Sequence, residues 1–304
     1  MAKRRKKRKY NKFFRIILIL ITVIYGFYLS EMDGTYSLDK TGDVFKEVKT
    51  DLKVSYLDVG QADAILVENN GEAMLIDAGN NEDGSLLVKY FKEEKINNFK
   101  YVIGTHPHED HIGGLDDIIN NFEIETIYMP DAITTTKTFM DVLDAIEIKN
   151  MTYKVPKIEE IFTLGEATIK VLYTGNDTKD LNNTSIVLRL IFGNTSFLFT
   201  GDATDKTEEE LLKSGLNIEA DVLKIGHHGS KYSTIDEFLR KVNPKYAIIS
   251  VGKGNSYKHP ENETLTKLNN NNIEIHRTDL EGTIIVTSDG NNININSVDI
   301  NVNG

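Results

Sequence analysis

One segment constrains this chain more than any other. A predicted strand, NFKYVIG, runs directly into THPHEDH (residues 105–111). Imidazole and carboxylate suit Zn²⁺, Mn²⁺ or Fe, and loops that follow strands can bring several ligands to one point. His106 and His108 can face one ion, whereas Asp110 and His111 can turn to a second. The chain has no cysteine, so any metal must be held by histidine and carboxylate side chains.

Two further strand ends carry candidate ligands. FTGD places Asp202 after a glycine turn, where its carboxylate can bridge two ions; the alternative is an ordinary helix N-cap. LKIGHHGS ends another predicted strand in His227 and His228. Strand-end loops carry many functional groups, so one of this pair is expected to ligate a metal. The other would contact substrate or orient its neighbour, and the sequence leaves open which is which.

The remaining histidines are less specific. YKHP places His259 in a loop, where it is either a substrate-binding or general-acid group or an ordinary loop residue. His276 lies in an apolar, strand-like run and is expected to be structural.

The first 30 residues differ in composition from the rest. Nine of the 35 Lys and Arg residues lie within the first 15 positions, so the remainder carries 26 basic against 46 acidic residues. The apolar run from position 13 to 29 would span roughly 26 Å as a helix, close to the hydrocarbon core. Basic residues ahead of such a run stay cytoplasmic. We predict a basic cytoplasmic tail (1–12), a transmembrane signal anchor (13–30) and an extracytoplasmic body, with a cleaved signal peptide as the alternative.

The body is expected to form one layered α/β domain. Residues 31–50 resemble a polar linker, and residues 51–304 alternate strands and helices. KVSYLDVG, ADAILVE and EAMLID predict strands, while GSLLVKYFKEE and DKTEEELLKSG have helical periodicity. Two β-rich halves with helices between them indicate a layered arrangement. The acidic balance disfavours avid, non-specific nucleic-acid binding.

Taken together, these motifs resemble the metallo-β-lactamase superfamily, and more narrowly the hydrolase domain of ComEC-type competence proteins and its stand-alone relatives. The matching stretches, in family order, are LDVGQADAILV, LIDAG, GTHPHEDHIGG, NNTSIVLRL, LFTGD, LKIGHHGS and SYKHP. They run from residue 52 to about residue 290. The resemblance implies a four-layer αββα sandwich with metals at one edge.

The resemblance also implies two divalent ions, Zn²⁺ or Mn²⁺, held by side chains from three loops. The candidate ligands are His106, His108, Asp110, His111, Asp202, His227 and His228. The first two histidines would hold one ion. The next acid and histidine, with one member of the 227–228 pair, would hold the other, and Asp202 would bridge.

Other roles follow from the same resemblance. Asp58 and Asp77 match acids that orient histidines or loops around the site. The candidate substrate-binding residues are Asn183, Ser230 and His259. The candidate catalytic groups are Asp110 and His259.

The sequence departs from the superfamily pattern in one respect. Many members have another histidine ligand between the first motif and the bridging acid, whereas none lies between positions 111 and 227 here. NNTS (182–185) occupies roughly that region. The first ion is therefore expected to be under-coordinated, weakly held, or completed by water or asparagine, and Mn²⁺ is as good a candidate as Zn²⁺.

These features predict a hydrolase. Two ions would lower the pKa of a shared water, so that hydroxide forms near neutral pH and attacks phosphorus or a carbonyl. The preferred hypothesis is a phosphodiesterase that acts outside the membrane on wall, lipid or choline-type phosphodiesters. One alternative is a ComEC-like DNA-degrading nuclease linked to DNA uptake; DNA is not the favoured partner, because the body is acidic. Another is an inactive binding module.

Overall fold

The computed structural model describes residues 36–38, 44–46, 51–177 and 179–298. The chain divides into two units, Met1–Lys49 and Thr50–Gly304. In the first, β1 (Tyr36–Leu38) pairs antiparallel with β2 (Val44–Lys46) inside the stretch expected to be a linker. The predicted cytoplasmic tail (1–12) and signal anchor (13–30) lie outside the described residues. Among the helices that are described, none is long and apolar enough to cross a membrane.

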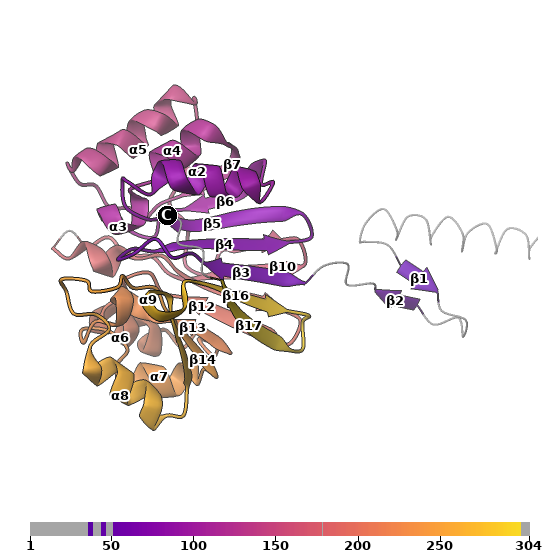
Figure 1. The fold of residues 1–304 in the computed structure, drawn as a ribbon, viewed down its shortest axis with the longest axis vertical. Helices are drawn as coiled ribbons and strands as arrows, with labels where there is room; N and C mark the ends of the chain where they lie inside the picture. Colours follow the sequence, from indigo (N-terminus) through magenta and orange to yellow (C-terminus); the bar gives the residue numbers. More distant parts are fainter. Residues whose placement is uncertain (1–35, 39–43, 47–50, 178, 299–304) are drawn as a thin grey trace, which may run out of the picture. The chain divides into compact units, whose positions relative to one another are not determined.

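The second unit contains two large sheets (Figure 1). The strands of the first are β3 (Leu52–Tyr56), β4 (Ala64–Asn69), β5 (Glu72–Ala78), β6 (Asn98–Ile103), β7 (Glu123–Tyr128), β8 (Tyr153–Lys154), β16 (Thr283–Ser288) and β17 (Ile293–Val298). Their order is β17-β16-β3-β4-β5-β6-β7-β8. Strands β5 to β8 run parallel, and the other pairs are antiparallel.

The second sheet has seven strands. They are β9 (Ile161–Leu164), β10 (Ala167–Tyr173), β11 (Val187–Phe192), β12 (Thr195–Phe199), β13 (Val222–Lys224), β14 (Tyr246–Ile249) and β15 (Glu274–Arg277). Their order is β15-β14-β13-β12-β11-β10-β9. Strands β12 to β15 run parallel.

Helices cover the outer face of each sheet (Figure 1). The eight-stranded sheet is covered by α2 (Gly84–Glu93), α4 (Leu115–Asn121) and α5 (Lys137–Ile148). The seven-stranded sheet is covered by α6 (Asp205–Ser214), α7 (Asp236–Val242) and α8 (Asn262–Asn270). Shorter elements are α3 (Glu109–Ile112), α9 (Thr278–Glu281) and the 3₁₀ turns η1 (Leu181–Thr184) and η2 (Gly226–Gly229).

Strand periodicity creates the layers. Successive side chains of a strand point to opposite faces, and in β4 Ile65 and Val67 enter the core between the sheets while Leu66 packs beneath the helices. Three buried apolar clusters result, one between the sheets and one under each helical layer. The predicted αββα sandwich is thereby confirmed for the described residues.

The core between the sheets offers a direct test of this packing. Phe197 is fully buried there and stacks against Phe199. Phe197→Ala should lower the free energy of unfolding by about 3–5 kcal/mol, because it removes buried apolar surface and leaves a cavity. Urea denaturation measures this change. Ile133→Ala is the control, since Ile133 is 77 % exposed, and equal effects of the two substitutions would contradict the proposed core.

A buried acid in α6 makes stability depend on pH. Glu208 is buried, and its carboxylate accepts hydrogen bonds from the backbone N–H groups of Thr234 (2.6 Å) and Ile235 (2.8 Å) at the start of α7. Burial raises the pKa of Glu208 from 4.5 to about 8. Because the folded-state pKa is the higher one, the contribution of Glu208 to stability is complete below pH 4.5 and is lost as pH rises through about 8.

We therefore expect Glu208→Gln to flatten the fall in unfolding free energy between pH 4.5 and 8. Urea denaturation over a pH series measures the slope in each protein. Glu209→Gln is the matched control, because Glu209 is exposed and forms a surface ion pair with Lys213. A slope that is the same in all three proteins would rule out a buried, protonated Glu208.

Candidate metal centre

The loops that carry the predicted ligands all leave the carboxyl ends of strands. Ligands in α/β sheets gather at this edge. The strand β6 leads into residues 105–111, β12 leads into Asp202, and β13 leads into η2 with its histidine pair. The first loop belongs to the eight-stranded sheet and the other two to the seven-stranded sheet, so the site forms only where both sheets meet.

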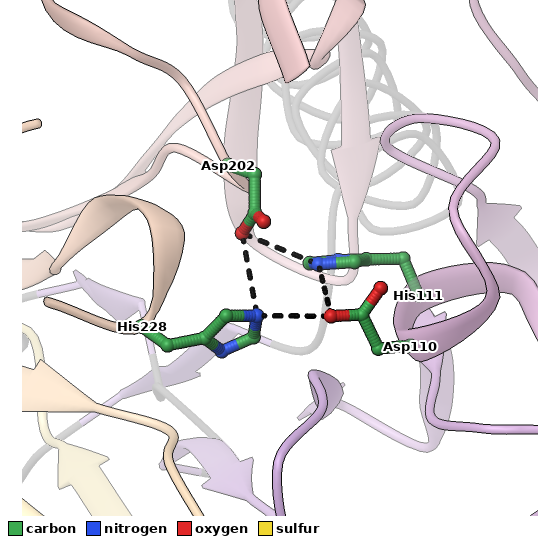
Figure 2. Close-up of side chains that lie close together, drawn as sticks. All are labelled: Asp110, His111, Asp202 and His228. Atoms are coloured by element: carbon green, nitrogen blue, oxygen red, sulfur yellow. Dashed lines mark ion pairs between the residues drawn. The ribbon is translucent and has the colours of Figure 1, made fainter. Parts of the chain in front are cut away.

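Four side chains converge on one point, and Figure 2 shows them facing one another. We call Asp110, His111, Asp202 and His228 the closed cluster. His111 Nε2 lies 3.2 Å from Asp202 Oδ1 and 3.9 Å from Asp110 Oδ2. His228 Nε2 lies 3.6 Å from Asp202 Oδ1 and 3.4 Å from Asp110 Oδ2. Ligand bonds of about 2.1 Å in a tetrahedral site separate neighbouring donor atoms by about 3.4 Å, so the spacing fits one ion.

The hydrogen bonds of the closed cluster also fit a cation. His111 Nδ1 donates to Asp77 Oδ2 (2.8 Å), and His228 Nδ1 donates to the Ser250 carbonyl (3.0 Å), since carboxylate and carbonyl oxygens are acceptors. Each ring therefore turns the lone pair of Nε2 toward the cluster. Both Nε2 atoms and Asp202 Oδ1 are buried without a hydrogen-bond partner in the described part of the chain. A divalent cation would satisfy all three, whereas unpaired buried polar atoms are costly.

Two more histidines face the other oxygen of Asp202, and a third lies beside one of them. His106 Nε2 lies 3.9 Å from Asp202 Oδ2, and His227 Nε2 lies 3.7 Å from the same oxygen. His108 Nδ1 lies 3.0 Å from His106 Nε2. We call His106, His108 and His227 the open cluster. Burial, together with the charge on His111, lowers the pKa of His106 well below its usual value, so the ring is neutral, which is the form that ligates metals.

Charge in the closed cluster is balanced between acids and imidazoles. Burial lowers the pKa of His111, but Asp202, Asp77 and Asp110 outweigh burial and hold that pKa well above its usual value. Burial raises the pKa of Asp202, but His111 and His228 outweigh burial and hold that pKa well below its usual value. The acids therefore require positive charge beside them, which either protonated imidazoles or a divalent cation can provide.

Backbone contacts fix the loop of residues 105–111. Asp77, at a left-handed φ of 59°, accepts hydrogen bonds from Thr105 N (2.7 Å) and Thr105 Oγ1 (2.7 Å) as well as from His111. Gly113 N donates to the Gly79 carbonyl (2.9 Å). A Cβ at position 113 would lie 2.2 Å from the carbonyl carbon of Asn80, so only glycine allows this approach.

The closed and open clusters lie along a cleft of about 830 Å³. The described residues that line it are Val59, Gly60, Gln61, Asn80, Asn81, Glu82, His108, Glu109, Asp110, Asn182, Asp202, His227, His228, Tyr257 and His259. The His259 ring packs between those of His227 and Tyr257, with centroids 5.7 and 5.8 Å away. His259 Nδ1 is buried and has no hydrogen-bond partner among the residues that the structure describes. Burial and the neighbouring histidine charges lower the pKa of His259.

Two of the candidate substrate-binding residues are buried and form hydrogen bonds within the protein. Asn183 is buried, and its Oδ1 accepts hydrogen bonds from Thr204 and Thr207, while its neighbour Asn182 lines the cleft. Ser230 is buried and its Oγ accepts a hydrogen bond from Tyr232 N (3.3 Å).

Asp58 lines a separate cavity of about 840 Å³ beside Gly252 and Thr278. Its carboxylate accepts a hydrogen bond from Gly60 N (3.1 Å), so it helps to orient the loop that begins the cleft.

Two residues that sequence analysis left without a role join the sheets behind the closed cluster. Lys224, which is fully buried at the end of β13, lies with its Nζ 2.9 Å from Oδ2 of Asp63, the residue before β4. Asp63 Oδ1 lies 3.5 Å from His228 Nδ1. Both residues lie within the matching stretches LDVGQADAILV and LKIGHHGS. The sequence feature that could have indicated this ion pair is a lysine within an otherwise apolar predicted strand, because a buried lysine needs an acidic partner.

Comparison with protein families matches residues 57–253 to the Metallo-beta-lactamase superfamily. The chain belongs to the metallo-beta-lactamase superfamily. This match, and the relatives below, confirm the resemblance inferred from the motifs. The protein is thus a hydrolase of this superfamily, with His and Asp side chains placed to bind a divalent metal.

Competence proteins are among its curated relatives. It is 31 % identical over 251 residues to ComE operon protein 3 of Bacillus subtilis. The aligned region covers 76 % of this chain and 32 % of the relative. It is 29 % identical over 252 residues to Recombination protein 2 of Haemophilus influenzae, which covers 80 % and 30 % respectively. The chain therefore spans about a third of the length of these relatives.

Solved structures show the same fold. The metallo-beta-lactamase fold protein YhfI from Bacillus subtilis superposes with a TM-score of 0.54 at 15 % identity, over 79 % of this chain and all of that chain. Igni18, a metallo hydrolase from Ignicoccus hospitalis, superposes with a TM-score of 0.51 at 16 % identity, over 78 % and 98 %. At these identities the likeness establishes the architecture alone.

The buried pair between the sheets gives a testable prediction. Lys224→Met leaves Asp63 as an unpaired buried carboxylate, so the free energy of unfolding should fall by about 3–5 kcal/mol. The double variant Asp63→Asn, Lys224→Met removes both charges and should recover most of the loss. Urea denaturation in the presence of a chelator measures both.

Lys245→Met is the matched control. Lys245 pairs with Asp221 at the same distance, 2.9 Å, but on the surface, so its loss should cost less than about 1 kcal/mol. If Lys224→Met were no more destabilising than Lys245→Met, the buried pair would not join the sheets.

Proposed function

We propose that this protein is a metal-dependent phosphodiesterase that acts at the outer surface of a membrane. The observation that carries the proposal is the chemistry of the cleft. Its ligands are imidazoles and carboxylates, and none of the described residues that line it is Lys or Arg. The exposed acids Glu82 and Glu109 stand beside these ligands. Such a cleft suits one phosphodiester at the metals and repels the flanking phosphates of a polyanion.

The groups attached to the phosphate are therefore expected to be neutral or cationic, as in lipid, wall or choline-type phosphodiesters. Tyr257, which is exposed and lines the cleft, offers an aromatic face for such a group. The body is also acidic overall, with 26 basic against 46 acidic residues after position 15, and this charge likewise disfavours a polyanionic substrate.

The chain contributes orientation and proton handling. When bound, divalent ions would supply Lewis-acid stabilisation of phosphate oxygens and lower the pKa of a water. Asp77 and the Ser250 carbonyl hold the rings of His111 and His228 in the ligating orientation. His259, which lines the cleft, would contact the leaving-group side, where its neutral ring can donate or accept one hydrogen bond.

The extracytoplasmic location rests on the composition of the first 30 residues. A cluster of basic residues precedes an apolar run long enough to span the bilayer. We propose a single-pass anchor that leaves the hydrolase domain outside the membrane.

A DNA-degrading nuclease is the second candidate. The observation that favours it is the similarity to ComE operon protein 3 and to Competence protein ComA of Neisseria gonorrhoeae, which is 42 % identical over 106 residues. A nuclease of this kind would lose DNA affinity steeply as salt increases.

The experiment compares the metal-loaded, purified full chain on bis-p-nitrophenyl phosphate, glycerophosphocholine and single-stranded DNA. We expect turnover of the first two that is abolished by a chelator. Asp202→Ala and His108→Ala should each lower activity by more than about 100-fold, because loss of a ligand exceeds the effect of removing an outer partner. His276→Ala is the control, since His276 pairs with Glu281 away from the cleft.

Different results select different functions. Salt-sensitive hydrolysis of DNA without turnover of the small esters would favour the nuclease. Activity unchanged in Asp202→Ala, or the absence of metal binding, would reject a metal-dependent hydrolase and favour a binding module.

A further inference from the structure

The histidine pair in η2 has an unusual backbone. His227 has φ 51° and ψ 44°, and His228 has φ 53° and ψ 23°. Both values lie in the left-handed region, which non-glycine residues adopt uncommonly. Strained conformations of this kind persist at functional sites, where the surrounding structure enforces them. The turn orients two adjacent side chains differently, since their rings lie at 66° with centroids 6.4 Å apart.

The two rings consequently face different oxygens of one carboxylate. His228 Nε2 lies 3.6 Å from Asp202 Oδ1, inside the closed cluster, whereas His227 Nε2 lies 3.7 Å from Asp202 Oδ2. The buried Nδ1 of His227 has no hydrogen-bond partner among the described residues. A structural hydrogen bond through that atom therefore does not account for the orientation of this ring.

Without His227, the open cluster would be short of a ligand. His106 lies on that side of Asp202 with His108 beside it, and the chain has no histidine between positions 111 and 227 to add to them. A structural or catalytic ion of this kind takes three or four protein ligands. His227 is placed to complete the set, since it shares Asp202 Oδ2 with His106.

We infer that the adjacent histidines divide between two ions, with His228 in the closed cluster and His227 as the replacement ligand in the open cluster. This inference rests on the proposed binding of two metals. It assigns His106, His108 and His227 to one ion, with Asp202 between the two ions. The left-handed turn at residues 227 and 228 places the two neighbouring rings on different oxygens of Asp202.

Asn182 is the rival for the same role. It lines the cleft, and its Oδ1 is buried without a hydrogen-bond partner from any described residue. An amide oxygen is a weaker ligand for Zn²⁺ than an imidazole but an acceptable one for Mn²⁺. Substituting His227 and Asn182 one at a time shows which of them holds the ion of the open cluster.

The test counts metal ions without using substrate. The full chain is stripped of metal, equilibrated with Mn²⁺ by dialysis, and analysed by mass spectrometry for metal content and by electron paramagnetic resonance. The wild type should bind two ions and give the spectrum of a coupled pair. His227→Gln should weaken one ion by more than about 100-fold and give the spectrum of an isolated Mn²⁺. His276→Gln and Asn182→Ala should retain the coupled pair.

His228→Gln provides the reciprocal arm, because it should remove the ion of the closed cluster and leave His227 with its partners. Circular dichroism and thermal unfolding verify that each variant is folded, and His227→Asn is a second variant if the first is not. A coupled pair that survives His227→Gln, its loss in Asn182→Ala instead, or a wild type that binds one ion would each overturn the division. A wild type that binds no metal would overturn the proposed function itself.

Discussion

The site depends on holding two sheets together at one edge. Asp63 precedes a strand of one sheet and Lys224 ends a strand of the other, and their buried ion pair spans the interface at 2.9 Å. A backbone hydrogen bond from Ile186 to the Thr105 carbonyl (3.0 Å) joins the same two halves. Since Asp110 and His111 follow the first sheet while Asp202 and His228 follow the second, these contacts set the spacing of every ligand.

Asp202 lies between the closed and open clusters and contacts histidines of both. Its oxygens face different groups of histidines, with His111 Nε2 3.2 Å from Oδ1 and His106 Nε2 3.9 Å from Oδ2. Its backbone N–H donates to Ser185 Oγ (3.1 Å), which fixes the turn after β12. A carboxylate held in this way needs little rearrangement to contact two cations, and such preorganisation is what a metal site requires of its protein.

The layers and the candidate ligands were largely predictable from local patterns. Alternating apolar residues gave the strands, helical periodicity gave α2 and α6, and the ligand motifs stood where strands end. The direction in which a loop side chain points was harder to predict than the position of the motif in the chain. Asn183 was a candidate for substrate binding, yet its side chain ties η1 to α6 and Asn182 lines the cleft. Neighbouring residues of a 3₁₀ turn point about 120° apart, and a motif does not specify which of them faces the solvent.

The sequence by itself determined the αββα class, the metal-binding chemistry and the absence of thiolate ligands, because these follow from residue types, periodicity and a recognisable order of motifs. Only the tertiary structure decided that His228 joins Asp110, His111 and Asp202, and that Lys224 meets Asp63. The physical reason is that the contacts of His228 with Asp110 and His111, and of Lys224 with Asp63, join residues from different sheets, more than 90 positions apart in the chain. Their geometry depends on how the sheets pack, and no local pattern encodes that distance.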